Sequence, residues 1–269
     1  MTVLPRHWTL PLRKRLMDLG LFGHAGYTPF IIAGRSRVGS NLLRSLLNAH
    51  PDVVAYGEIF RDLASRDWDH TGYFQSAADA ALVQADPVRF IDSRVFGRYP
   101  RSVRAVGFKL FYYHAREGAA AAVWPWLLAR RDLKVIHLKR GNLLQTHVSR
   151  KRAALTGKWV NTSGEPDRAV TLTLDADEVR ADFEQTRAWE TDCDRVFSAH
   201  PLLQVQYERL ASDYQGESRR LEAFLGVGPQ DVRPATYQQS TQPLSATIAN
   251  YHELKARFAG TPWSEFFNE

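Results

Sequence analysis

The stretch TPFIIAGRSRVGSNLLRSLL, at residues 28–47, places the strongest constraint on what this chain can fold into. Residues 27–32 are a short apolar run of β-forming residues, and a loop containing two glycines follows them. Four leucines between positions 42 and 47 then recur with the spacing of one helix face, and Pro51 marks the end of that pattern. A strand, a glycine loop and a helix in this order predict the first unit of an α/β fold.

The same alternation continues along the chain. We expect further strands at residues 103–113, 133–138 and 202–207, and helices at 76–84, 87–96, 115–129, 142–155, 175–199 and 217–225. Strands that alternate with helices predict a mostly parallel sheet with helices on both faces, in a P-loop-like α/β arrangement. We expect a single domain over residues 1–269, with an N-terminal arm (1–27), a flexible loop (156–170) and a C-terminal tail (229–269) packed on the domain.

Charge and cysteine content narrow the functional classes. The formal charge of +6 suits an anionic ligand or surface. The single cysteine, Cys193, excludes an internal disulfide and a cysteine-rich zinc site, and it favours a reducing, cytoplasmic compartment. The nine histidines show no paired ligand spacing, so we expect no bound metal.

The N-terminus mixes basic and apolar residues, with Arg6 and Arg13 close to Trp8 and several leucines. Such a segment can lie on an anionic membrane surface as an amphipathic helix. It can equally form an arm packed on the domain, which is the simpler interpretation. The sequence leaves peripheral membrane contact open.

The loop itself has the composition of an anion site. Consecutive backbone N–H groups at the start of a helix, together with the helix dipole, favour a phosphate or sulfate group. Within six positions the loop adds cationic and hydroxyl side chains: Arg35, Ser36, Arg37 and Ser40. A tight turn with merely solvated side chains leaves this concentration of polar residues unexplained.

Three known loop types fit less well. Gly34 and Gly39 have the separation of a Walker ATP-binding loop, but Ser40 stands where the lysine belongs. A serine-hydrolase elbow, G-x-S-x-G, is one residue shorter than this loop. The dinucleotide fingerprint G-x-G-x-x-G is absent.

Three segments together resemble a known family. RSRVGSNLLRSLLNAHPDVVAYGEIF resembles the 5′-phosphosulfate-binding loop and helix of sulfotransferases, closest to the bacterial carbohydrate and glycolipid branch with its lipopolysaccharide, nodulation-factor and trehalose enzymes. VIHLKRGNLLQTHVSRKRA is similar to the family's 3′-phosphate-binding strand and helix, and QYERLASDYQGESRRLEAFLGV to its Tyr-Glu-x-Leu…Phe-Leu-Gly segment. With the tail, the resemblance covers residues 28–267.

The resemblance implies the sulfotransferase fold and a sulfuryl transfer from 3′-phosphoadenosine 5′-phosphosulfate (PAPS), which leaves 3′-phosphoadenosine 5′-phosphate (PAP). A sulfuryl group carries less negative charge than a phosphoryl group, so a metal clamp is less needed. Arg37 matches the family's basic residue and is assigned to the leaving oxygen, and Arg35 is an extra cation. The 5′-phosphate would be bound by the loop and helix start, at Arg35, Ser36, Arg37, Val38, Gly39, Ser40 and Asn41.

By the same resemblance, Arg140 and Ser149 bind the 3′-phosphate and Tyr207 contacts the adenine. Arginine suits such a phosphate because it can bind it through two parallel hydrogen bonds. The spacing of nine between Arg140 and Ser149 is that expected of the bacterial branch, where cytosolic animal enzymes have eight.

An acceptor hydroxyl must lose its proton as it attacks, so a general base is expected. Glu58 in AYGEIF matches the glutamate that serves the bacterial branch. Lys109 in GFKLFYYH is a second cation near the transferred group. His114 is the alternative base, although it stands five places after the lysine and not the two of cytosolic members.

The sequence therefore predicts a sulfotransferase acting on an acceptor hydroxyl, of a carbohydrate or glycolipid, and no nucleic-acid partner. Trp159 is a candidate to stack on a sugar or to cover the acceptor cleft. Two alternatives stay open: a P-loop-like nucleotide kinase with an altered loop, and a non-catalytic module that binds a nucleotide or a nucleic acid. Nothing in the sequence indicates an oligomeric state.

Overall fold

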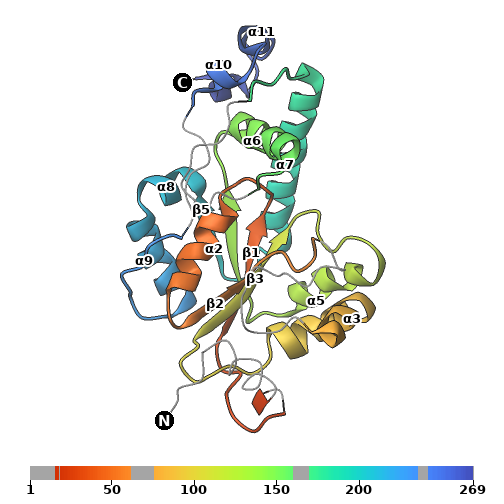
Figure 1. Ribbon diagram of the computed structural model, residues 1–269, viewed down its shortest axis with the longest axis vertical. Coiled ribbons are helices and arrows are strands. Elements are labelled where there is room, and N and C mark those ends of the chain that lie inside the picture. The colour runs from red at the N-terminus through yellow and green to blue at the C-terminus, as the bar shows by residue number, and fades with distance from the viewer. Residues whose placement is uncertain (1–15, 18, 62–75, 160–169, 236–241, 269) are drawn as a thin grey trace.

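The computed structural model describes residues 16–17, 19–61, 76–159, 170–235 and 242–268 (Figure 1). The basic segment before residue 16 lies outside these residues, as does most of the expected loop at 156–170. In the described part of the chain, no helix is long and apolar enough to cross a membrane.

One parallel sheet organises the described residues. Its five strands lie in the order β2-β3-β1-β4-β5, and each neighbouring pair is parallel. They are β1 (Thr28–Gly34), β2 (Val53–Tyr56), β3 (Ala105–Phe111), β4 (Lys134–Lys139) and β5 (Leu202–Gln206). The predicted α/β class with a parallel sheet is therefore confirmed.

Strand β2 is the one strand of this sheet that the sequence analysis missed. Its four residues, VVAY, are all buried, and they pair with β3 from Val53 opposite Ala105 to Tyr56 opposite Phe108. Four consecutive apolar residues show neither the alternation of a half-exposed strand nor the length of a helix. The strand forms because the neighbouring β3 offers it a complete set of backbone partners.

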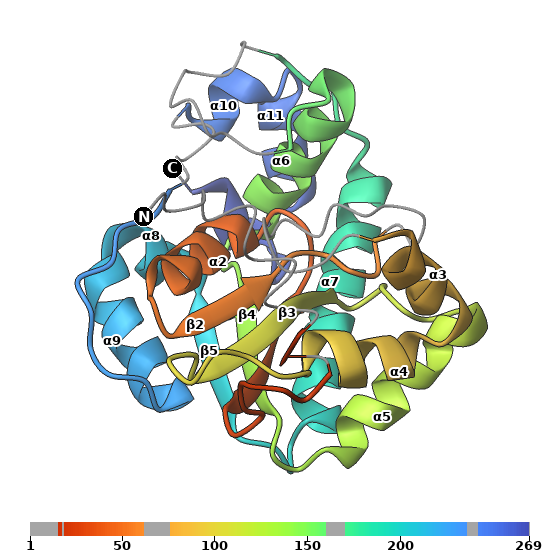
Figure 2. The ribbon, with the colours of Figure 1, turned by 60° about the horizontal axis from the view of Figure 1, so that its bottom comes forward.

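Helices cover both faces of the sheet (Figure 2). In β1, Ile31 and Ala33 face one hydrophobic cluster, whereas Phe30 and Ile32 face another, because successive side chains of a strand point to opposite sides. The first face is covered by α3 (Ala77–Ala85), α4 (Pro87–Phe90), α5 (Val123–Ala129) and α7 (Ala176–Val196). The second is covered by α2 (Ser40–Ala49), α8 (Tyr207–Ser212) and α9 (Tyr214–Leu225).

A third cluster lies beyond the end of the sheet, where α6 (Leu143–Thr156) packs with α7 and the C-terminal elements (Figure 1). Phe183 of α7 contacts the rings of Phe258, Trp263 and Phe266 at centroid distances of 5.8, 5.6 and 5.2 Å. The C-terminal elements are α10 (Leu244–Thr247), α11 (Tyr251–Arg257) and a 3₁₀ turn (Ser264–Phe267), none of which the sequence pattern revealed.

Two expected helices are divided. The helix expected at 87–96 begins as α4 and continues as a π-helical turn, Ile91–Val95. The one expected at 115–129 is a 3₁₀ turn, Gly118–Ala122, followed by α5. Pro125 lies in the first turn of α5, where its missing N–H leaves no hydrogen bond unmade.

Candidate active site

The loop between β1 and α2 has the backbone of an anion-binding turn. Arg37 and Gly39 both lie in the left-handed region, with φ of 72° and 89°. A Cβ at Gly39 would fall 2.3 Å from Cδ2 of Tyr207, so only glycine fits there. As the N-cap residue of α2, Gly39 has no side chain to accept hydrogen bonds from the first-turn N–H groups. The start of α2 therefore keeps donors available for an anion.

The two arginines of the loop have different surroundings. Arg35 is 4% exposed; its guanidinium donates to Asp182 Oδ1 at 3.0 Å and also donates to the hydroxyl of Thr186. The side chain of Arg35 is therefore paired with residues of α7, and its assignment to the donor site stays a prediction. Arg37 Nε instead donates to Ser149 Oγ at 2.9 Å, and its Nη1 donates to the carbonyl of Trp159.

Asp182 is the centre of a separate ion-pair cluster. Besides Arg35, it accepts hydrogen bonds from His147 Nδ1 at 3.0 Å and from Arg150 Nη2 at 2.7 Å. Burial raises the pKa of Asp182, but the hydrogen bond from His147 and the charge of Arg150 outweigh it and leave the pKa below its ordinary value. We call Arg35, His147, Arg150 and Asp182 the Asp182 cluster.

The residues expected at the 3′-phosphate and adenine lie around Arg37. Arg140 leaves the end of β4, donates to the Arg37 carbonyl at 3.2 Å, and lies 4.5 Å from the ring centroid of Tyr207. Ser149, on α6 and nine residues after Arg140, accepts from Arg37 Nε. Tyr207 is the first residue of α8 and not the last of β5, and its ring lies against Gly39.

The remaining loop residues lie in the core, at the start of α2 or next to Tyr113. The Val38 side chain is 1% exposed and belongs to the core beneath α2, so only its backbone can reach a ligand. Ser40, also buried, is the first residue of α2, and Asn41 follows it. The Ser36 N–H donates to the Tyr113 hydroxyl at 3.3 Å.

The candidate base lies beside this loop. Lys109 of β3 is fully buried, and its Nζ donates to Asn41 Oδ1 at 2.7 Å and to Glu58 Oε1 at 3.1 Å. Glu58 follows the end of β2, the neighbour of β3 in the sheet. Because the carboxyl ends of parallel strands meet at one edge, Glu58 and Lys109 are brought to the loop together.

His114 lies on the other side of the Glu58 carboxylate, with its Nε2 4.0 Å from Oε2. The Phe111 N–H donates to His114 Nδ1 at 3.3 Å, so the proton of the neutral ring is on Nε2 and faces Glu58. The pKa of His114 is lowered to about 4, because burial, the largest effect, together with the charges of Lys109 and Arg61 outweighs the opposing charge of Glu58. In neutral His114, Nδ1 already accepts from the Phe111 N–H and Nε2 carries a proton, so neither nitrogen has a free lone pair for the acceptor proton. Glu58 is therefore the better placed base.

Tyr113 is a site residue that the sequence analysis missed. It lies two residues after the end of β3, its hydroxyl contacts the loop at Ser36, and its ring edge meets His114 at a centroid distance of 5.0 Å. The only available signal was its position, since the residues just after a strand of a parallel sheet reach the carboxyl edge.

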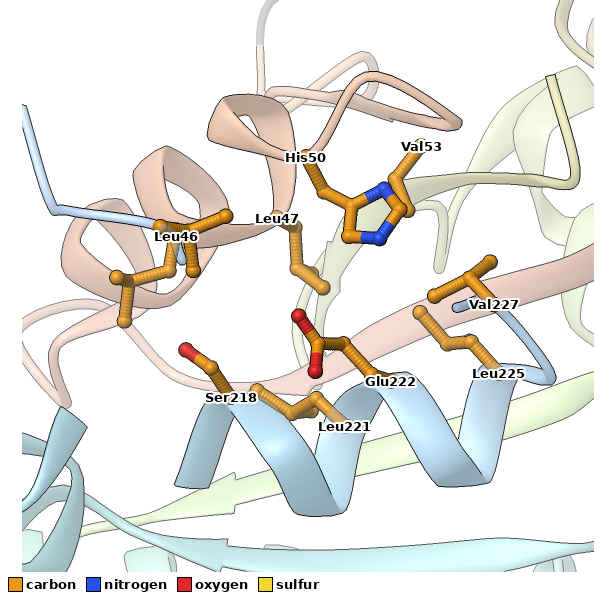
Figure 3. Close-up of a pocket in the computed structure, with 10 residues that line it drawn as sticks. Leu46, Leu47, His50, Val53, Ser218, Leu221, Glu222, Leu225 and Val227 are labelled. Atoms are coloured by element: carbon orange, nitrogen blue, oxygen red, sulfur yellow. The ribbon is translucent and has the colours of Figure 1, made fainter. Parts of the chain in front are cut away.

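A small pocket lies elsewhere, between α2 and α9 (Figure 3). It leaves about 10 Å³ for the centre of a water molecule, which is space for roughly one water. Ser218 Oγ at its wall is buried and has no hydrogen-bond partner among the described residues. This pocket suits a bound water, whereas a small-molecule site needs roughly 300 Å³ or more. Within the described ranges, no three His, Cys, Asp or Glu side chains are grouped to hold a metal ion.

Several known proteins are similar to this chain. The chain is 26% identical to nodulation protein H of Rhizobium tropici over 243 residues, which covers 89% of this chain and 92% of the relative. It is 29% identical to nodulation protein H of Rhizobium meliloti (strain 1021), covering 89% and 94%. A solved sulfotransferase from Alicyclobacillus acidocaldarius is similar at 18% identity and a TM-score of 0.47, covering 86% of this chain and 90% of that one.

The family assignment rests on a family model. The model described as the sulfotransferase family matches residues 29–231, which is more than half of the chain and includes every site residue discussed above. The chain therefore belongs to the sulfotransferase family.

Proposed function

We propose that this sulfotransferase uses PAPS as donor and transfers its sulfuryl group to a hydroxyl of a carbohydrate or glycolipid. One observation carries the donor assignment: Arg140 and Ser149 both contact the loop arginine Arg37, and Tyr207 lies against Arg140 and Gly39 beside the start of α2. A donor with both a 5′-phosphosulfate and a 3′-phosphate needs cations at two positions around its nucleoside. Arg37 and Arg140 supply them.

The chemistry needs few groups. The acceptor oxygen attacks sulfur, the bond between sulfur and the bridging oxygen breaks, and the electron pair remains on the 5′-phosphate of the PAP product. Arg37 and the N–H groups of the loop would stabilise the charge that develops on that phosphate. Lys109 would neutralise the oxygens of the transferred group.

The acceptor proton goes to Glu58. Lys109 and Asn41 fix the direction of this carboxylate from one side, and the N–H of neutral His114 faces it from the other. A positioned base contributes typically ~10²–10⁴-fold to such a step. No metal takes part in this scheme.

Ligand preference tests the donor assignment. PAP should raise the melting temperature more than AMP or ATP does, because a ligand that binds only the folded state stabilises it by mass action. The shift with PAP should not need Mg²⁺. Arg140→Ala should erase the preference for PAP over AMP. A shift with ATP only in the presence of Mg²⁺ would contradict the proposal and support a nucleotide kinase.

Transfer of labelled sulfate from PAPS to a panel of sugars, glycolipids and small alcohols tests the acceptor class. Label in the sugar or glycolipid products supports the proposal. Label in the small alcohols alone overturns the carbohydrate assignment.

A further inference from the structure

Two exposed aromatic side chains border the candidate active site. Among the described residues, the exposed large apolar or aromatic side chains are Leu19, Leu21, Tyr113, Leu155 and Trp159. Tyr113 is 41% exposed and Trp159 is 47% exposed. A large exposed ring beside a reactive site is informative because it offers apolar surface that a ligand can cover.

Tyr113 is held in place on several sides. Its hydroxyl accepts from the Ser36 N–H, its ring lies 5.7 Å from Trp189 between centroids, and it meets the His114 ring nearly at a right angle. The ring centroid of Phe111 lies 5.8 Å from that of Tyr113. Such contacts fix the ring before any ligand arrives, so stacking on it costs little conformational entropy.

The position of Tyr113 relates it to the acceptor and not to the nucleoside. Its hydroxyl contacts the donor loop, and its ring contacts His114, which faces Glu58. An acceptor hydroxyl that attacks sulfur must lie between the loop and Glu58. The rest of that acceptor molecule therefore extends over or next to Tyr113, whereas Tyr207 lies against Gly39 and Arg140.

Trp159 provides a second exposed aromatic ring, on a segment whose backbone contacts the donor loop. Its carbonyl accepts from Arg37 Nη1, so the backbone of the segment after α6 is attached to the loop. Polar side chains lie beside the donor loop and are joined by hydrogen bonds: Asn41, Glu58 and Lys109. A site that joins exposed rings to charged and amide groups suits a ring with an apolar face and several hydroxyls, which describes a pyranose.

We propose that Tyr113 is an acceptor-binding residue that selects pyranose rings by stacking on their apolar face, with Trp159 as the second aromatic wall. This inference rests on the proposed function and adds the substrate class and the residue that recognises it. Tyr113 takes no part in the chemical step. Its ring, and not its hydroxyl, recognises the acceptor.

The test compares ring and open-chain acceptors. Methyl pyranosides of glucose, galactose and N-acetylglucosamine are compared with their open-chain alditols, which carry similar hydroxyls without the ring. The wild-type protein should show a higher kcat/KM for the best pyranoside than for its alditol. Tyr113→Ala should lower kcat/KM for the pyranoside by about 10-fold, mainly through KM, and leave the alditol unchanged, since stacking contributes on the order of 1 kcal/mol.

Two control variants separate the ring from other effects. Tyr113→Phe retains the ring and loses only the contact to Ser36, so it should keep the pyranoside preference. Leu21→Ala removes another exposed apolar side chain and should change neither acceptor. Equal losses in Tyr113→Ala and Tyr113→Phe, or equal losses for both acceptors, would overturn the inference.

The PAP-induced thermal shift distinguishes this failure from failure of the proposed function. A wild-type protein without preference for PAP refutes the donor assignment. A protein that prefers PAP and transfers sulfate, but uses alditols as well as pyranosides, refutes only the role of Tyr113.

Discussion

The loop after β1 carries two arginines two residues apart, Arg35 and Arg37, and the side chains that surround them differ. Arg35 is enclosed by the Asp182 cluster, where α6 and α7 supply an acidic centre for its charge. Arg37 contacts the Ser149 hydroxyl and the Trp159 carbonyl, and its own carbonyl accepts from Arg140. Arg35 is thus bound in a buried ion pair, whereas Arg37 lies among the residues of the candidate donor site.

The backbone produces this difference. Arg37 has φ of 72°, a left-handed conformation that is uncommon for residues other than glycine. This turn directs the two arginines to different neighbours, so Arg35 meets α7 and Arg37 meets α6. Two similar side chains in one short motif therefore have different surroundings, and the following variants test whether their roles differ as well.

Glu58→Gln should have the largest effect. The glutamine keeps an oxygen that can accept from Lys109, but it cannot take the acceptor proton, so kcat should fall by ~10²–10⁴-fold with PAP binding retained. Steady-state kinetics of sulfate transfer measure this. Asp92→Asn, at a carboxylate that is 67% exposed, is the matched control and should keep its kcat. An unchanged kcat in Glu58→Gln would assign the base to another residue.

Arg37→Ala should lower kcat by ~10²–10³-fold, the usual consequence of removing one group that stabilises developing charge. Its melting temperature should change little. Arg35→Ala should show the reverse, with a lower melting temperature and a kcat per folded molecule near that of the wild type. Equal losses of kcat in both variants would contradict the separation of the two clusters.

Asp182→Ala should destabilise the protein by about 3 kcal/mol or more, because it leaves buried Arg35 and its neighbours without their acceptor. The melting temperature should fall by roughly 6–12 °C. Asp192→Ala removes an ion pair to Arg195 in which both side chains are largely exposed, and it should cost less than about 1 kcal/mol. A similar loss in both variants would show that the Asp182 cluster does not stabilise the fold.

Lowering the pH should weaken the fold through its buried histidines. Burial lowers the pKa of His114 and of His137 to about 4, below the ordinary 6.5. The unfolded chain therefore takes up protons first, and the free energy of unfolding should fall as the pH drops from 6.5 to 4, by up to about 2–3 kcal/mol per histidine.

Urea denaturation between pH 7 and 4.5 measures this dependence. His137→Asn should have a shallower pH dependence than the wild type, even though the substitution also removes the hydrogen bonds to Tyr112 and Asp194. An identical slope would mean that His137 does not titrate on unfolding in this range.

Much of the fold was predictable because its signals are local. Four of the five strands follow from apolar runs, and the helix starts at Asn142 and Asp175 follow from side chains that cap their own helices. Strand β2 and the C-terminal elements were missed. Four buried residues have no periodicity of their own, and the tail aromatics pack against Phe183, far away in the sequence.

In the candidate site, too, some residues could be predicted from the sequence and others could not. The residue types of the loop, its glycine and the strand ends that carry Lys109 and Arg140 are visible in the sequence, and the structure places them around one edge of the sheet. Tyr113 could not be distinguished from the other aromatics near the end of β3. Its exposure depends on which residues of α7 lie over it, and Trp189 covers only part of the ring.

The sequence alone specifies an α/β chain with an anion-binding loop, because hydrophobic periodicity and glycine placement act over a few residues. The roles of Arg35 and Arg37 depend on tertiary structure. The acidic partner of Arg35 is 147 residues away, and the hydroxyl partner of Arg37 is 112 residues away. Only the packing of α6 and α7 against the edge of the sheet brings these partners to the loop, so that the first arginine pairs with a carboxylate of α7 and the second contacts a hydroxyl of α6.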